Sequence, residues 1–249
     1  MAASPAAARL TEAHRLAQAR LAAVVVRQML ALWPLLDPER LDATVARWLS
    51  MTVPVVRRQR IVSARLTGQY LQAFRAVELG TVERFTPSVA DDVAVEAVTA
   101  SLVVTGPASI KSAMRRGVRL EQAVEAARVR VAGAAMRHTL AGGRDTLTAT
   151  ARSDTRALGW ARATSARPCP FCAMLASRGA VYGSESVHFA AHDHCSCSGE
   201  IRYRDDADLP SGSDRWRDLW RQANNAGGDP MDEFRRLVTS VEDRPTPVG

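Results

Sequence analysis

Apolar residues recur at helical spacing along the first half of this 249-residue chain. The clearest early set recurs every three or four residues, which places its members on one face of a helix. Its members are Leu21, Val25, Met29 and Leu32. Pro34 follows directly, and a proline cannot continue a helix without the loss of a backbone hydrogen bond. The pattern therefore predicts a first helix that ends before Pro34.

Two further helices are predicted before residue 80. The sequence DPE at residues 37–39 has the features of a helix start, with an aspartate N-cap, a proline in the first turn and an acid near the positive end of the helix dipole. Apolar residues continue this helix to Leu49. A third helix is predicted over residues 53–79, and Gly80 is expected to end it.

The central region is also predicted to be helical, in several shorter pieces. Asp91 and Asp92 are candidate N-caps for the first piece. The sequence TGP at residues 105–107 interrupts the pattern, and Gly142 and Gly143 are expected to end the longest piece. The expected helices cover residues 93–102, 108–116, 120–140 and 144–152.

The pattern changes near residue 158. Short strands are predicted at 159–164 and 199–204, on either side of a cysteine-rich segment. A polar linker over 205–213 precedes a weakly amphipathic tail, in which Trp216 and Trp220 are expected to be exposed contact residues. We therefore predict a mainly α protein with an N-terminal helical region at 1–85, a central helical region at 86–156, a small α+β metal-binding module of zinc-knuckle type at 157–205, and a linker with a short helical tail at 206–249.

Composition agrees with a globular helical protein. Hydrophobic residues make up 47% of the chain and charged residues 24%, which is ordinary for a soluble domain. Alanine, leucine and valine dominate and aromatics are only 5%, which favours helices. The first residues lack the pattern of a signal peptide, and no run of apolar residues is long enough for a membrane span. We therefore expect a soluble protein that is made in a cytoplasm, without membrane contact.

The net charge of +7 and the pI near 10 have two interpretations. A basic surface could meet DNA or an acidic protein. Alternatively, a GC-rich coding sequence favours arginine, and the arginines lie on solvated helix faces. Adjacent arginines occur at 57–58 and 115–116, and these pairs are short and scattered rather than concentrated as in a nucleic-acid-binding arm. The second interpretation is therefore favoured.

All four cysteines lie within residues 169–197, together with three of the five histidines. Cys169 and Cys172 form a Cys-x2-Cys pair, and His192 and Cys195 form a His-x2-Cys pair. Two such knuckles can direct four soft ligands at one ion, and thiolate with imidazole suits zinc. We predict one structural zinc ion held by Cys169, Cys172, His192 and Cys195.

Several alternatives to this site stay open. Cys197 can replace a ligand if it shares an extended segment with Cys195, in which case His192 lies outside the coordination sphere. His188 and His194 are expected to face solvent or to support the ligands. A disulfide framework needs an oxidising compartment, a redox-active pair needs a thioredoxin-like setting, and inert buried cysteines do not explain the neighbouring histidines.

Three segments resemble a known family. They are ALGWARAT at 157–164, CPFCAMLASRG at 169–179 and HDHCSC at 192–197. Together they are similar to the phage Mu F-like minor head proteins, in the form found in phages of actinobacteria. The resemblance covers most of residues 50–205, and the family's Cys-x2-Cys and His-x2-Cys fall on the four predicted ligands. Asp193 stands where that family often has proline.

The resemblance implies a function that residue patterns alone do not. It implies a virion protein of a tailed bacteriophage, in the head interior or at the portal vertex, that assists head morphogenesis or genome delivery. Its implied partners are the portal protein, the major capsid protein, or both, with packaged DNA as a further contact.

Two other functions compete with this one. Relatives of this type are often labelled capsid maturation proteases. The candidate residues for such a reaction are Ser177, Ser184, Ser186, His188, Asp193, His194 and Cys197. None of the serines lies in a Gly-x-Ser-x-Gly motif, and the chain has no His-Glu-x-x-His. A DNA-binding protein is the second alternative, and only the net charge supports it.

Overall fold

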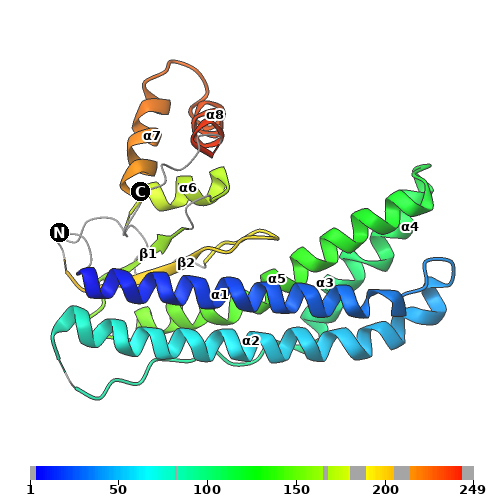
Figure 1. The fold of residues 1–249 in the computed structure, drawn as a ribbon, viewed down its shortest axis with the longest axis horizontal. Helices are drawn as coiled ribbons and strands as arrows, with labels where there is room; N and C mark the ends of the chain where they lie inside the picture. Colours follow the sequence, from blue (N-terminus) through cyan, green and yellow to red (C-terminus); the bar gives the residue numbers. More distant parts are fainter. Residues whose placement is uncertain (1–3, 82, 165–167, 180–188, 205–212, 243–249) are drawn as a thin grey trace, which may run out of the picture.

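The computed structural model describes residues 4–81, 83–164, 168–179, 189–204 and 213–242. A long helical bundle carries a smaller module above one of its ends (Figure 1), so the predicted mainly α fold is confirmed. In chain order the elements are α1 (Pro5–Leu32), the 3-10 turn η1 (Trp33–Leu35), α2 (Leu41–Leu79), α3 (Val95–Thr105), α4 (Pro107–Arg115), α5 (Leu120–Ser153), β1 (Gly159–Ala163), α6 (Pro170–Ser177), β2 (Ser198–Arg202), α7 (Asp214–Asn224) and α8 (Pro230–Glu242).

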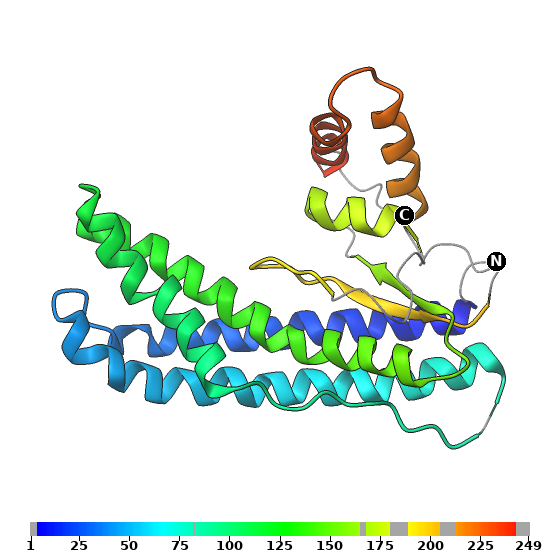
Figure 2. The same cartoon turned by 180° about the vertical axis from the view of Figure 1, so that it is seen from behind.

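Three long helices form the bundle. Helix α1 runs against α2 and α5, and these three pack side by side along most of the molecule (Figures 1 and 2). Residues 83–94 return along the bundle as an extended segment, which Thr146 and Thr150 of α5 hold by hydrogen bonds to backbone amides. Helices α3 and α4 then cover the end of the bundle that is far from the small module.

Helix α1 begins and ends where its sequence predicts. Ser4 is the N-cap, and its hydroxyl accepts a hydrogen bond from the Ala7 amide. At the other end the chain passes into the 3-10 turn that contains Pro34. By length and composition alone, α1 with this turn could cross a membrane. Its inner face, however, carries polar groups that bond to α2, such as Gln18 to the carbonyl of Ser63.

The second and third predicted helices are a single helix, so the predicted interruption between Leu49 and residue 53 is wrong. Helix α2 continues through Pro54, whose ring is exposed on the outer side of the helix. The backbone acceptor that Pro54 leaves without a partner can therefore bond to water, and packing against α1 and α5 holds the rest of the helix. The predicted stop at Gly80 is confirmed, with a left-handed φ of 61°.

The predicted helix start at residues 37–39 is four residues early. The Asp37 carboxylate accepts bonds from the Glu39 amide and the Arg40 guanidinium, which closes a turn, and α2 begins at Leu41. Asp92 behaves similarly, because its carboxylate accepts from the next amide while α3 begins at Val95. Asp37 therefore closes a local turn before α2, Asp92 lies in the extended segment before α3, and neither residue caps a helix.

The predicted helix end at Gly142 and Gly143 is also wrong, because α5 runs without a break from Leu120 to Ser153. These glycines allow close packing instead. A Cβ added at Gly142 would lie 2.3 Å from the carbonyl oxygen of Arg60, and one at Gly143 would lie 2.5 Å from the Thr67 hydroxyl. Helix α2 therefore approaches the backbone of α5 more closely than any side chain would permit.

Replacing Gly142 with alanine tests this contact. Alanine raises helix propensity by about 1 kcal/mol, but the added methyl group must displace the α2 backbone, and such overpacking costs about 1–3 kcal/mol. We expect urea unfolding to show a net loss of stability of up to about 2 kcal/mol. Gly228→Ala is the control, since a Cβ there meets nothing within 4 Å. A gain in stability for Gly142→Ala would contradict the close approach.

The two predicted strands are confirmed and pair with each other. Strands β1 and β2 are antiparallel, with Gly159 opposite Arg202 and Ala163 opposite Ser198. Both strands are buried along their whole length, because β2 lies on the bundle and α6 covers β1. The predicted polar linker lies almost wholly outside the described residues.

A buried ion pair fastens this small sheet to the bundle. The Arg75 guanidinium of α2 bonds to Asp154, which follows α5, with an N–O distance of 2.8 Å. Their side chains are only 9% and 2% exposed, respectively. Tyr203, just after β2, donates its hydroxyl to the same carboxylate at 3.1 Å. One carboxylate therefore joins three segments of the chain.

The C-terminal helices belong to the core of the small module. Trp216 of α7 is fully buried, so its predicted exposure is wrong, and its indole nitrogen donates to the Thr164 hydroxyl. Trp220 is half-buried and meets Phe234 of α8 edge to face. Helices α7 and α8 both pack on α6. The tail is more strongly amphipathic than predicted, because α7 and α8 each carry an apolar face, and both helices pack on α6.

Candidate metal centre

Two structural elements bring the cysteines together. Cys169 is the N-cap of α6, where its sulfur accepts a hydrogen bond from the Cys172 amide at 3.4 Å. Pro170 occupies the first position of α6, which fixes the entry of the chain into the helix. Cys195 and Cys197 lie in the segment that leads into β2, so pairing between β2 and β1 places them beside α6.

The ligand atoms form two overlapping groups, each of which is close enough together to surround a metal ion. Cys169 Sγ is 2.8 Å from His192 Nε2, and Cys172 Sγ is 4.0 Å from the same nitrogen and 3.4 Å from Cys195 Sγ. Two groups have all their ligand atoms within 4.8 Å, and Cys172 belongs to both; they are Cys169, Cys172 and His192, and Cys172, Cys195 and Cys197. The structure thus brings the four predicted ligands and the substitute Cys197 into one cluster.

The cysteines are free thiols rather than disulfides. Their close contact splits their pKa values. Hydrogen bonding with Cys172 lowers the pKa of Cys169 to about 5 and, with further bonds, that of Cys195. The pKa of Cys172 is raised because it acts as the shared donor. For Cys197, hydrogen bonding with Cys172 acts downward, but its bond with Cys195 and its burial raise the pKa to about 12.

The divergent pKa values of the four cysteines indicate that the cluster needs a bound cation. Thiolates at these distances repel one another, so only some of them can ionise while the cluster contains no cation. A bound cation removes the repulsion and lets all ligands coordinate as thiolates. The donor set of sulfur and imidazole nitrogen fits a soft or borderline metal ion. The cluster can therefore hold a metal, and which four residues bind stays a prediction.

Two buried arginines fix the second knuckle, and sequence reasoning missed both. Arg144 of α5 donates to the carbonyl oxygens of Cys195 and Cys197 at 2.6 and 3.3 Å. Arg162 of β1 donates to the Ala190 carbonyl at 2.8 Å and lies over the Phe189 ring, 4.0 Å from its centroid. No local pattern links these arginines to the cysteines. The one sequence signal that could have identified these arginines as buried is their position within apolar segments.

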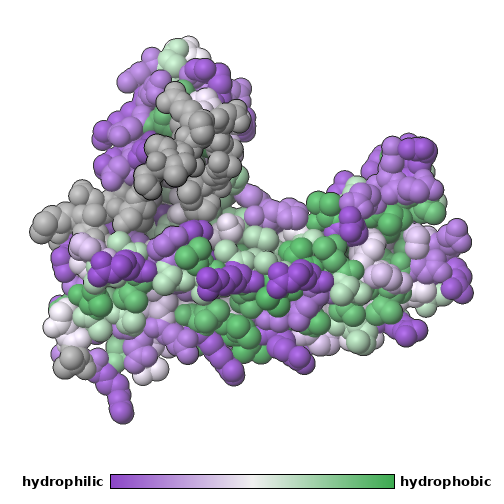
Figure 3. All heavy atoms as spheres, viewed as in Figure 1, coloured by the Kyte–Doolittle hydropathy of each residue, from purple (hydrophilic) through white to green (hydrophobic). Residues whose placement is uncertain are grey.

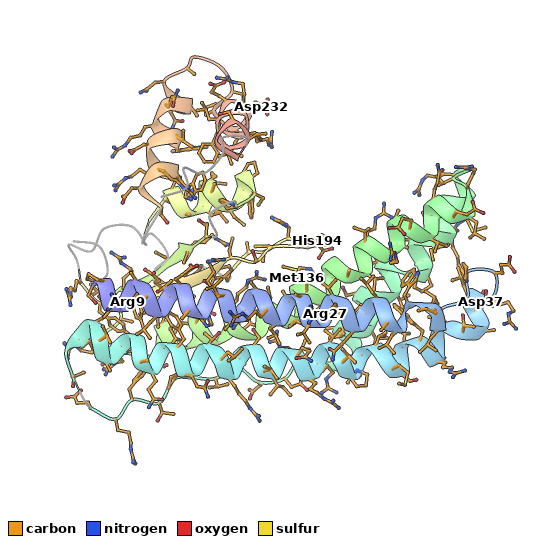
Figure 4. The ribbon with its side chains drawn as sticks, in the orientation of Figure 1. Arg9, Arg27, Asp37, Met136, His194 and Asp232 are labelled. Carbon is orange, nitrogen blue, oxygen red and sulfur yellow. The ribbon has the colours of Figure 1, made fainter. Side chains whose placement is uncertain are left out.

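The segment with the second knuckle rests on α5. The Asp193 carboxylate accepts a bond from Arg137 at 2.7 Å, which anchors this segment on α5. His194 has a positive φ of 64°, and its ring lies against Gly133, where an added Cβ would be 2.5 Å from Nε2. Figure 4 shows His194 above α5, close to Met136. His194 is exposed, as predicted, whereas His188 lies outside the described residues.

The candidate protease residues do not form a catalytic group in the part of the chain that the structure describes. The Ser177 hydroxyl is buried and donates to the Met174 carbonyl within its own helix. Cys197 is buried, while His194 faces solvent. Asp193 is bonded to Arg137. Ser184 and Ser186 lie outside the described residues.

The fold and the site together define a class: a mainly helical protein whose long bundle carries a small module with a cysteine–histidine cluster that could hold a metal ion. Within that class, the chain belongs to the VG15 protein family, whose model matches residues 5–223. VG15 is a family of viral proteins. The matched region includes the whole bundle and every residue of the cluster. Comparisons with curated proteins and with solved structures found no match.

Proposed function

We propose that this protein is a minor head protein of a tailed bacteriophage, located at the portal vertex or in the head interior, where it assists head assembly or genome delivery. Its membership of a viral family across residues 5–223 carries this proposal. The Mu F-like pattern at Cys169, Cys172, His192 and Cys195 narrows it to the minor head proteins. Its partners are the portal protein, the major capsid protein, or both, and packaged DNA is a further contact.

The architecture supports a structural rather than a catalytic role. The long bundle presents an extended surface for docking, and the metal cluster joins segments that are too short to form a core of their own. No candidate nucleophile meets a base and an orienting group among the residues whose positions are described. Family labels alone therefore support the protease alternative, and net charge alone supports the DNA-binding alternative.

We further propose that the ion is zinc with a structural role. Thiolate and imidazole in tetrahedral sets are typical of structural zinc sites. In the ligand cluster Cys172, Cys195 and Cys197 are buried, Cys169 is half-buried and His192 is exposed. Four protein ligands fill a tetrahedral site, which leaves no open position for a substrate or a reactive water. Elemental analysis of protein purified without chelators should give one zinc per chain.

Mass spectrometry of purified particles tests the main proposal. We expect this chain in procapsids and mature virions, at far fewer copies than the major capsid protein. The reason is that a portal vertex occurs once per head, whereas the shell protein repeats over the whole surface. Its absence from both kinds of particle would contradict the proposal. Incubation with purified major capsid protein separates the protease alternative, which requires specific cleavage.

A further inference from the structure

The end of the bundle opposite the metal cluster forms a distinct helical tip. We define this tip as residues 104–131, comprising α4 and the start of α5 with the end of α3. It diverges from the α1–α2 turn, toward the side of the bundle on which the small module lies (Figures 1 and 2). An open groove runs along the tip between α4 and α5. Its lining residues include Val104, Ala108, Ser112, Arg115, Arg116 and Arg130.

The groove is positively charged and has no carboxylate in its lining. The tip has six basic residues against two acidic ones, Glu121 and Glu125, and Glu125 is paired with Arg128. Arg116 bonds to the Ser112 hydroxyl, and Arg115 bonds to a backbone carbonyl. None of the three groove arginines makes an ion pair with the described part of the chain.

Pairing is common elsewhere on this surface. Arg57 pairs with Asp92 across two segments, and Arg137 pairs with Asp193. Arginines in the C-terminal helices pair with acids one turn away. The unpaired arginines of the groove therefore lie together on a surface where many others are neutralised. A guanidinium group binds a carboxylate through two parallel hydrogen bonds, so this groove fits an acidic ligand.

Apolar side chains also reach solvent on the tip. Val104 in the groove is 64% exposed, and elsewhere on the tip Val129 is 51% and Met114 is 45% exposed. Figure 3 shows this end of the molecule as hydrophilic residues beside hydrophobic ones. A nucleic-acid backbone offers phosphates to the arginines but nothing apolar to the valines. An acidic amphipathic helix offers both, and helix-in-groove docking is a recurrent mode of recognition.

We propose that the tip groove docks an acidic amphipathic helix of another head protein, whose carboxylates pair with Arg115, Arg116 and Arg130 while its apolar face covers Val104. This inference rests on the proposed function, because it places the partner within the virion head. It names a contact surface at the opposite end of the molecule from the metal cluster.

Photo-crosslinking inside assembled heads tests the docking. The variant Ala108→p-benzoylphenylalanine places the probe in the groove, and the same change at Ala73, exposed on α2, is the matched control. We expect irradiated heads to give a cross-link from position 108 to an acidic segment of a different head protein. Position 73 should not give this product. A cross-link to DNA or to a second copy of this chain would overturn the proposal.

Charge reversal tests the role of the arginines. In the Ala108 probe background, Arg115→Glu, Arg116→Glu and Arg130→Glu together should reduce the cross-link at least tenfold. A control with Arg47→Glu, Arg58→Glu and Arg65→Glu makes the same charge change on exposed positions of α2 and should retain it. Exclusion of the tip variant from heads that accept the control variant would give the same support. An unchanged cross-link would overturn the proposal.

Two further results separate the possible failures. If the unaltered chain is absent from heads, the proposed function fails and the docking fails with it. If the chain is present but position 108 gives no cross-link, only the docking proposal fails. The thermal unfolding midpoint of each variant monitors folding. Should the triple tip variant prove unstable, Arg130→Glu alone replaces it, with a severalfold loss of the cross-link as the expected result.

Discussion

Replacing Cys172 with serine is expected to release the metal ion and to make residues 165–200 sensitive to proteases, while the bundle stays folded. Cys172 belongs to both groups of ligand atoms, so its loss disrupts both of them. Metal binding contributes on the order of 10 kcal/mol to folding in small zinc-finger peptides. One end of the bundle shares a core with the cysteines through residues such as Leu147. The rest of the bundle has a separate core around Trp48, Val56 and Leu102, so we expect it to stay folded without the ion.

Elemental analysis and limited proteolysis measure the two parts of this result. Ser196→Ala is the matched control, because it lies between two cysteines and supplies no ligand atom. It should retain both the metal and the protection. If Cys172→Ser keeps full protection, and protein prepared without chelator contains no zinc, the cluster is not a metal site and its cysteines have another role.

Replacing Asp154 with alanine should destabilise the whole protein by about 3–5 kcal/mol, because removing one partner of a buried ion pair leaves the other charge uncompensated. Arg75 would lose its partner, and Tyr203 would lose the acceptor of its hydroxyl. Urea unfolding followed by circular dichroism measures the change.

Asp218→Ala is the control for Asp154→Ala. Asp218 pairs with Arg221 on α7, and both side chains are more than two-thirds exposed. Exposed pairs contribute between about 0 and 1 kcal/mol, so this variant should unfold almost like the original protein. An equally small effect for Asp154→Ala would show that the pair does not hold the sheet on the bundle.

The sequence predicted the type of nearly every element, but several boundaries were wrong for a common reason. Pro54, Gly142 and Gly143 are helix breakers by local chemistry, and each lies inside a long helix. The Pro54 ring faces solvent, and the two glycines accept the backbone and side chains of α2. Such tolerance depends on a neighbouring helix that cannot be identified from local spacing, whereas Gly80 ends α2 through its own left-handed backbone.

The candidate site was also predictable from the sequence only in part. Ligand spacing alone selected Cys169, Cys172, His192 and Cys195, because two short knuckles suffice to direct soft ligands at one ion. The supporting contacts from Arg144 and Arg162 come from α5 and β1, at least seven residues outside the cysteine segment. The burial of Trp216 could have been predicted, because α7 is strongly amphipathic by itself, but its partner α6 could not be identified from the sequence.

The unbroken helix α5 fixes the distance between the two ends of the molecule. Its 34 residues span about 50 Å at 1.5 Å per residue. The helical tip lies at one end of this span and Asp154, which fastens the metal-binding module, lies just beyond the other.

That length cannot be changed by a single insertion. One added residue in α5 would rotate all later side chains by about 100° around the helix axis, and Gly142 and Gly143 would no longer face α2. A longer or shorter bundle therefore requires insertions or deletions of whole helical turns at matching positions in α2 and α5. The distance between the two ends is thus set jointly by α2 and α5, and neither helix can change its length without the other.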